Sequence, residues 1–260
     1  MTAITIQRMK PQLFILTGGS RGMGLAMAKQ ILSQGHQLLT IARQRNDVLD
    51  SVAQAHQATI TQWRHDLAMP EQAAQHLLQW LSTLSSGEFQ RIVLINNAGV
   101  IPPIAPLSHS DWHAISQALR VGLEAPMLLT SAFLRATDSW NIPRQVLNIS
   151  SGMGRRAMAS QATYCAAKAG MDLFSQSVAL DEATKPNGAK ICSLAPGVID
   201  TDMQAHLRSA SETAFPDVSR FANLKSSGSL TSPEEAGARV LAWLERKDFG
   251  NPVIADVRQA

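Results

Sequence analysis

The chain has 260 residues, of which 45% are hydrophobic and 17% charged, with a net charge of +3 at pH 7. This length and composition favour a single α/β domain with a sizeable core and exclude a disordered chain. The basic residues are scattered, which argues against a nucleic-acid partner. No apolar run approaches the ~20 residues that span a bilayer, and the N-terminus lacks a signal-peptide core. We therefore expect a cytoplasmic protein that contacts neither membrane nor nucleic acid.

Short apolar runs alternate with longer amphipathic segments. This alternation predicts a doubly wound parallel sheet of about seven strands with helices on both faces, in a single domain over 1–260. We expect strands at 13–17, 37–42, 59–63, 92–95, 145–149, 190–194 and 253–255. We expect helices at 22–34, 47–56, 70–84, 111–136, 161–184 and from 232 onward.

Two segments stand out from this pattern. Pro126 lies inside the helix predicted at 111–136 and should bend it or interrupt its hydrogen bonds. The polar segment at about 204–230 is rich in Ser and Ala and is the expected flexible region. It is either a lid over a site or a long surface loop.

A Gly-rich stretch at 17–24, with the sequence Thr-Gly-Gly-Ser-Arg-Gly-Met-Gly, stands between the first predicted strand and the first predicted helix. Glycine there permits a tight turn and lets backbone N–H groups approach a pyrophosphate at the positively polarised helix end. The alternative is a plain turn between strand and helix. The position between these two elements favours the dinucleotide site.

The end of the second predicted strand indicates which dinucleotide is bound. Proteins that bind NAD commonly place an acidic residue there, but this strand ends in Arg43, with no acid before Asp47. Arg43 and Arg21 could clamp a 2′-phosphate, because guanidinium matches phosphate in charge and geometry. We therefore expect NADP(H). The alternative is that both are ordinary surface arginines.

Tyr164, the only tyrosine, precedes Lys168 by four residues in a predicted helix, so both side chains lie on one face. An ammonium beside a phenol favours the phenolate and should lower the pKa of Tyr164 from about 10. Such a tyrosine can act as a general acid or base near neutral pH. Alternatively, the two residues only share a half-buried helix face. Ser151 lies thirteen residues before Tyr164.

The two cysteines, Cys165 and Cys192, have no metal-ligand spacing. We expect both to be free thiols without a catalytic role, although Cys165 adjoins Tyr164. The sequence predicts no metal site.

These patterns resemble the short-chain dehydrogenase/reductase family over nearly the whole chain. The motifs that carry the resemblance are Thr-Gly-x-x-x-Gly-x-Gly at 17–24, Asn96-Asn97-Ala98-Gly99, Ser151 before Tyr164-x-x-x-Lys168, and Pro196-Gly197 with Thr201. The resemblance implies a Rossmann-fold domain and a catalytic set of Ser151, Tyr164 and Lys168. Finer stretches, among them 125–129 and 196–204, resemble the benzil reductase and sepiapterin reductase-like branch, whose members reduce carbonyls with NADPH.

The resemblance also implies which residues bind NADP(H). The phosphates would be wrapped by Gly18, Ser20, Arg21, Gly22 and Met23. Asp66 with Leu67 would touch the adenine, and Asn97, with Ala98 and Gly99, would lie along the adenine-side ribose. Tyr164 and Lys168 would lie at the nicotinamide ribose, and Pro196, Gly197, Ile199 and Thr201 at the carboxamide. Asp66 could instead cap the next helix, and Asn96 should bond neighbouring strands.

In the implied reaction a hydride passes from the nicotinamide to a carbonyl carbon, Tyr164 gives a proton to the oxygen, and Ser151 stabilises the developing charge. The family also places an asparagine in the central helix, where it helps to hold a water that links the lysine to solvent. Here that position is Gly122. Either a water fills the volume and preserves the relay, or turnover is slower.

The sequence thus predicts an NADPH-dependent carbonyl reductase, in particular one for diketones of the benzil type. A non-catalytic NADP(H)-binding regulator and a reductase of another carbonyl class are the alternatives. The substrate pocket should be apolar, lined by Val100, Ile101, Ile104, Met153, Met158 and Met203, unless these belong to the core. Arg155 and Arg156 either recognise an anionic substrate or lie exposed. The resemblance also suggests a homodimer or homotetramer through the two long helices.

Overall fold

The computed structural model describes residues 10–259. As predicted, its seven strands form one parallel sheet, and their order in the sheet is β3-β2-β1-β4-β5-β6-β7. The strands are β1 (Leu13–Thr17), β2 (Gln37–Ala42), β3 (Ile60–Arg64), β4 (Ile92–Asn96), β5 (Arg144–Ile149), β6 (Lys190–Ala195) and β7 (Ile254–Asp256). The strand order reverses between β1 and β4, and ligands bind at the carboxyl ends of the strands beside such a reversal.

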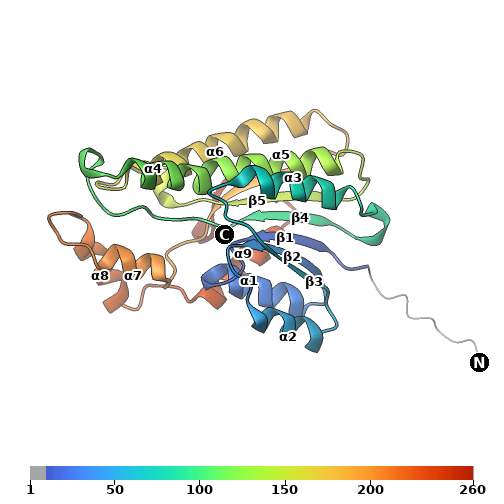
Figure 1. The fold of residues 1–260 in the computed structure, drawn as a ribbon, viewed down its shortest axis with the longest axis horizontal. Helices are drawn as coiled ribbons and strands as arrows, with labels where there is room; N and C mark the ends of the chain where they lie inside the picture. Colours follow the sequence, from blue (N-terminus) through green and yellow to red (C-terminus); the bar gives the residue numbers. More distant parts are fainter. Residues whose placement is uncertain (1–9, 260) are drawn as a thin grey trace, which may run out of the picture.

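Helices cover both faces of the sheet (Figure 1). One face carries α1 (Gly22–Ser33), α2 (Asp47–Ala55) and α9 (Pro233–Leu244). The other carries α3 (Pro70–Leu81), α4 (Trp112–Leu119), α5 (Ala125–Thr137) and α6 (Ala162–Ala183). Short helical turns are η1 (Ser86–Glu88), η2 (Leu107–His109), η4 (Gly152–Gly154) and η5 (Val257–Gln259). No helix in 10–259 is long and apolar enough to cross a membrane.

The residues of β1 show how the two helical layers are held. Phe14 and Leu16 belong to the apolar cluster under α1 and α9, whereas Leu13 and Ile15 belong to the cluster under α3 and α5. Successive side chains of a strand point to opposite faces, so one strand contributes to both layers. All four residues are buried, as expected for a central parallel strand covered on both faces.

The predicted helix at 111–136 is interrupted near Pro126. Between α4 and α5 lies a π-helical turn, η3 (Arg120–Glu124), in which the N–H of Ala125 donates to the carbonyl of Arg120. Pro126 has no N–H to donate to the carbonyl of Gly122, the bond that a continuous α-helix would require. The proline therefore accounts for the interruption, and Gly122 lies within it.

About half of the polar segment at 204–230 is helical. It contains most of α7 (Asp202–Arg208) and all of α8 (Val218–Ser226). Four buried side chains form an apolar cluster of their own in this segment, namely Leu207, Phe215, Val218 and Phe221. α7 and α8 lie beyond the carboxyl edge of the sheet, on the side of α1 and opposite α4 (Figure 1).

Candidate active site

The Gly-rich turn lies at the carboxyl end of β1 and opens α1. Gly18 has φ +72°, and a Cβ on it would lie 3.0 Å from the Cα of Ala98. A Cβ on Gly24 would lie 2.1 Å from the carbonyl oxygen of Gly18. Both positions therefore require glycine, one for its backbone conformation and the other for lack of space.

The first turn of α1 has no side-chain cap. Arg21, at the N-cap position, instead directs its guanidinium to the carboxylate of Asp202 at 3.1 Å. The first N–H groups of the helix thus have no side chain competing for them, and such groups bind phosphate. Open N–H groups beside an arginine fit the pyrophosphate of a dinucleotide.

Thr17 and Asn97 join the turn to the end of β4. The Thr17 hydroxyl accepts from the backbone N–H groups of Asn97 and Ala98, each at 2.9 Å. The Asn97 side chain donates to the carbonyls of Thr17 at 3.0 Å and Gly18 at 3.3 Å. Asn97 therefore shapes the turn from the side of β4. Asn96 donates across to Asn148 at 2.8 Å, which confirms that it bonds neighbouring strands.

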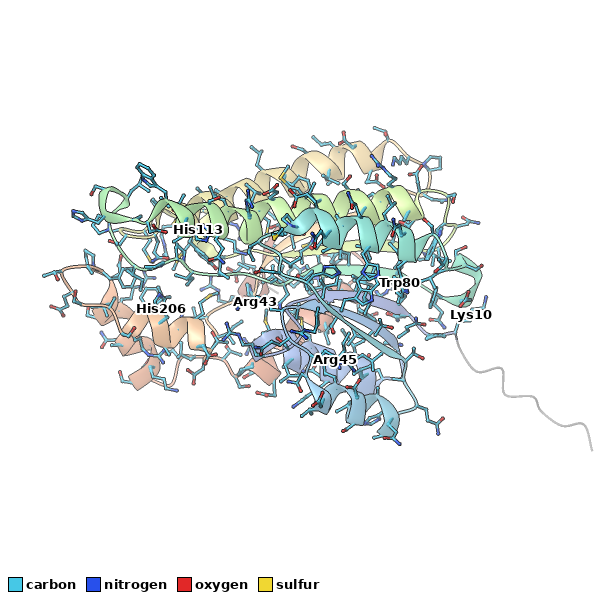
Figure 2. All side chains as sticks on the ribbon, in the orientation of Figure 1. Lys10, Arg43, Arg45, Trp80, His113 and His206 are labelled. Atoms are coloured by element: carbon cyan, nitrogen blue, oxygen red, sulfur yellow. The ribbon has the colours of Figure 1, made fainter. Side chains whose placement is uncertain are left out.

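Arg43 lies exposed at the carboxyl edge of the sheet, and Arg45 lies beside α2 (Figure 2). Arg45 pairs with Asp50 at 3.2 Å, and Asn46 donates to the carbonyl of Ser20 at 2.9 Å. No carboxylate within 10–259 forms an ion pair with Arg43. The segment after β2 is thus bonded to the Gly-rich turn, and the Arg43 guanidinium is available to an anion.

The loop after β3 carries Asp66 and Leu67. Asp66 accepts from the N–H of Ala68 at 3.0 Å, so it caps the turn that leads into α3. Leu67 is buried. The capping role considered for Asp66 is therefore present, although the bonded atom belongs to the turn before α3.

The segment after β6 lies against the Gly-rich turn. A Cβ on Gly22 would lie 3.7 Å from the Thr201 methyl group. Gly197 has φ +85°, which favours glycine, and Ile199 forms a bridge with Thr231. The residues expected at the two ends of a dinucleotide thus meet at one edge of the sheet.

Tyr164 and Lys168 lie on the inner face of α6 and are almost fully buried, 8% and 4% exposed. The Lys168 ammonium donates to the carbonyl of Ile149 at 2.7 Å and lies 5.8 Å from the centre of the Tyr164 ring. Ser151 is the N-cap of η4 and accepts from the N–H of Met153 at 3.2 Å, and its hydroxyl is near enough to the Tyr164 phenol to lower the pKa of that group. The fold therefore brings the three predicted catalytic residues together.

The expected lowering of the Tyr164 pKa is wrong for this structure. Burial raises the pKa of Tyr164 to about 12, against a smaller lowering by the Ser151 hydroxyl. Burial also lowers the pKa of Lys168 to about 8. Both groups are removed from water, which disfavours the phenolate of one and the ammonium of the other. Tyr164 is therefore fully protonated at neutral pH, the form that a proton donor needs.

Gly122 faces α6 beside the turn that carries Tyr164 and Lys168. A Cβ at this position would lie 3.2 Å from the Cβ of Ala167, the residue before Lys168. Such a contact is close enough that one of the two helices would have to yield slightly. The glycine lets the π-helical turn η3 approach α6 closely.

The expected pocket residues divide into three groups. Ile101, Ile104, Met153 and Met158 pack against the apolar cluster of the 204–230 segment. Val100 packs against the core between the sheet and the layer of α3 and α5, and Met203 is half-buried. Arg155 and Arg156 are both exposed, and Arg155 is also bonded to Asp172. Asp172 was not singled out from the sequence, although the four-residue spacing of Tyr164 and Lys168 reaches it when continued.

A family model described as short chain dehydrogenase matches residues 12–212. The chain belongs to the short-chain dehydrogenase family. It is therefore an oxidoreductase that acts on CH–OH and C=O groups, with a site of the kind that holds NAD(H) or NADP(H).

Similar proteins lie within the predicted branch. A benzil reductase from Bacillus cereus, described as forming (S)-benzoin, is 34% identical over 90% of this chain and 94% of its own length. Sepiapterin reductase from Mus musculus is 31% identical over 90% of this chain and 92% of its own. The crystal structure of KRED1-Pglu matches with a TM-score of 0.77 at 26% identity, over 92% of this chain and 98% of that one. The resemblance drawn from the sequence is thus confirmed.

Proposed function

We propose that this protein is an NADPH-dependent carbonyl reductase whose substrates are diketones of the benzil type. The observation that carries the proposal is a buried, protonated Tyr164 set between Ser151 and the Lys168 ammonium. The benzil reductase relative supports the choice of diketones.

The roles of the three residues follow from their chemistry. Bound NADPH supplies the hydride for the carbonyl carbon. Tyr164 holds the proton that passes to the carbonyl oxygen, and the Ser151 hydroxyl donates a hydrogen bond to that oxygen as charge develops. The Lys168 ammonium stabilises the phenolate that remains.

The preference for NADPH rests on Arg43 and Arg21. Arg43 is exposed and forms no ion pair within 10–259. Arg21 is the N-cap residue of α1, and its guanidinium is bonded to Asp202. We assign the 2′-phosphate to these two guanidinium groups, because phosphate pairs with arginine in charge and geometry. The other cofactor contacts are those expected from the family motifs.

The apolar cluster of the 204–230 segment supports a substrate with large apolar groups. Its buried side chains, with Ile101 and Met153, come from three separate segments of the chain. Hydrophobic and aromatic linings with few polar groups are typical of small-molecule sites. We propose that this segment acts as a lid over the aryl groups of the diketone.

Because glycine replaces the family's asparagine at position 122, only the backbone of this residue is available to hold a water that carries protons to Lys168. Pro126 deprives the Gly122 carbonyl of its usual helical donor, and Gly122 lies against the turn of α6 that carries Lys168. A water bonded to that carbonyl would need no side chain. We propose that such a water returns the proton and that turnover persists.

We further propose a homodimer or homotetramer formed through α5 and α6. Leu173 and Leu180 are 66% and 73% exposed and lie seven residues apart on α6, so they share one face. Met127 on α5 is also exposed. Leu180→Glu should lower the mass measured by light scattering, and an unchanged mass would argue against this face.

The cysteines support a reducing environment. Cys165 and Cys192 are both free. Burial raises the pKa of the Cys192 thiol to about 12, which makes it unreactive. Free thiols suit the cytoplasm, where we place the protein.

Depletion of NADPH tests the proposed function. The purified protein is offered diketones, quinones, pterins and hydroxysteroid ketones with NADPH or NADH, and Ser151→Ala is run beside it. We expect the fastest turnover with benzil and NADPH, and a loss of about 10²-fold in Ser151→Ala. Tight NADPH binding without turnover of any carbonyl would favour the non-catalytic regulator instead.

A further inference from the structure

Asp172 is a buried carboxylate on the catalytic face of α6. It is 7% exposed and lies four residues after Lys168 and eight after Tyr164, so the three side chains share one face. A buried carboxylate without partners would be strongly unfavourable. The partners of Asp172 therefore indicate what the charge does in this fold.

Both carboxylate oxygens have partners. Oδ1 accepts from the hydroxyls of Ser150 and Ser193, each at 2.6 Å. Oδ2 accepts from Nε of Arg155 at 3.2 Å. Ser150 follows β5 and directly precedes Ser151, Ser193 lies in β6, and Arg155 follows η4. One carboxylate thus joins α6 to two strands and to the turn that begins at Ser151.

The turn formed by η4 and Arg155 packs closely against α6 beside the contact between Arg155 and Asp172. Arg155 also donates to the carbonyl of Ala255 in β7 at 2.9 Å. A Cβ on Gly154 would lie 3.0 Å from the carbonyl oxygen of Lys168 and 3.2 Å from Oδ2 of Asp172. No side chain fits between the turn and the helix at the level of Lys168.

We propose that Asp172 is a positioning residue for this active site. Through Ser150 and Arg155 it holds Ser151 at a set distance from Lys168. The role rests on the proposed function, because Asp172 acts through residues that would touch the substrate.

The charge of Asp172 also bears on Lys168. Burial lowers the pKa of Lys168, and Asp172 opposes that fall. The other titratable or charged groups around this pair are Tyr164 on α6, Arg155 after η4, Cys192 on β6, and Asp256 on β7, which is paired with Arg258. Burial raises the pKa of both Tyr164 and Cys192 to about 12, so both are neutral at pH 8. Asp172 is therefore the charge that acts most directly on Lys168, and Arg155 is the cation paired with Asp172.

Asp172→Asn is the principal test. The asparagine keeps an oxygen for the two serine hydroxyls, but it loses the charge and turns an NH₂ group toward Arg155. We expect kcat to fall about tenfold or more and KM for NADPH to stay within about twofold. The alkaline limb of the kcat/KM profile should move to lower pH, because the Lys168 ammonium loses its nearest anion.

Arg155→Met should shift the profile in the opposite direction. This change removes the cation and leaves the Asp172 carboxylate, so the Lys168 ammonium is favoured. We expect a lower kcat with the alkaline limb at higher pH. A shift to lower pH in both variants would overturn the proposal, because it would show general disruption of the site.

Glu182→Gln is the matched control. Glu182 is a second buried carboxylate of α6, paired with Arg144 at 3.5 Å, and it lies about 21 Å beyond Lys168 along the helix. Its loss should lower thermal stability without moving the alkaline limb. If Asp172→Asn behaved in this same way, with kcat unchanged, Asp172 would be only structural and the proposal would be wrong.

Two further measurements keep the test decisive if Asp172→Asn folds poorly or turnover is absent. Ser193→Ala removes one bond to Asp172 and keeps every charge, so kcat should fall about twofold with no shift of the limb; a shift would count against the charge argument. Titration of ¹³C-labelled lysine by NMR, assigned with Lys168→Met, reports the pKa of Lys168 without turnover. It should be lower in Asp172→Asn than in wild type, and an equal value would refute the proposal. The shift without any carbonyl turnover would refute the proposed function alone.

Discussion

The two ends of the proposed cofactor site are built in opposite ways. At the acid–base end, Tyr164 and Lys168 are almost completely buried, and the Lys168 ammonium is bonded to a backbone carbonyl. At the phosphate end, Arg43 is exposed, and the ion pair of Arg21 with Asp202 has side chains that are 71% and 84% exposed. One end holds its groups away from water and the other presents its charges to it.

This difference determines how strongly each end responds to change. Burial raises the pKa of Tyr164 to about 12 and lowers the pKa of Lys168 to about 8, because a low-dielectric interior disfavours charge. Exposed charges are screened by water and salt, and exposed ion pairs contribute about 0–1 kcal/mol. Removal of a titratable group at the buried end should therefore have a larger effect than removal of a charge at the exposed end, and only the latter effect should be sensitive to salt.

The largest effect is expected from Tyr164→Phe. The change removes the proton donor and keeps the buried ring, so kcat should fall about 10²–10⁴-fold while NADPH still binds. Steady-state rates with benzil and NADPH binding by fluorescence measure the two effects. Full activity in this variant would refute the role of Tyr164 as the proton donor.

The burial of Lys168 should make the free energy of unfolding depend on pH. The folded pKa of Lys168, about 8, lies below its ordinary value of 10.5, so between these values the unfolded chain binds a proton that the folded protein lacks. The free energy of unfolding should then rise with pH across this window, by roughly 3 kcal/mol relative to Lys168→Met. Urea unfolding of both proteins from pH 7 to 10 measures it. Parallel curves for the two proteins would contradict the depressed pKa.

A smaller effect is expected at the phosphate end. Arg43→Ser should raise KM for NADPH about tenfold, since a charged hydrogen bond contributes roughly 1.5–3 kcal/mol, and should leave KM for NADH unchanged. The difference between the cofactors should shrink at high salt. Arg45→Ser, at a side chain already paired with Asp50, is the control. Equal losses for NADPH and NADH would rule out the 2′-phosphate contact.

The smallest effect is expected from Gly122→Asn. The new side chain must fit against Ala167, 3.2 Å from the position of its Cβ, and kcat should change by no more than a few-fold if a water already serves the relay. The rate of NADPH oxidation and its pH dependence test this. A rise of tenfold or more would mean that the native glycine leaves the relay incomplete.

Most of the fold and the pairing of Tyr164 with Lys168 could be predicted from local patterns, and the family resemblance added Ser151 as the third candidate catalytic residue. The period of the apolar residues placed every strand within about two residues, and the Tyr164–Lys168 spacing identified a helix face that is now seen to be buried. Two features could not be predicted in this way. The pKa of Tyr164 depends on how much water the surrounding segments exclude, and the partners of Asp172 come from β5, β6 and the turn after η4.

The amino-acid sequence alone specifies the order of strands and helices, the glycines of the cofactor turn and the residues available for acid–base chemistry. These features depend on local periodicity, backbone conformation and side-chain type, and short stretches of sequence determine all three. The tertiary structure adds the charge state of those residues and the carboxylate that holds them in place. Both depend on burial and on contacts between residues distant in sequence, such as Asp172 with Ser150 and Ser193.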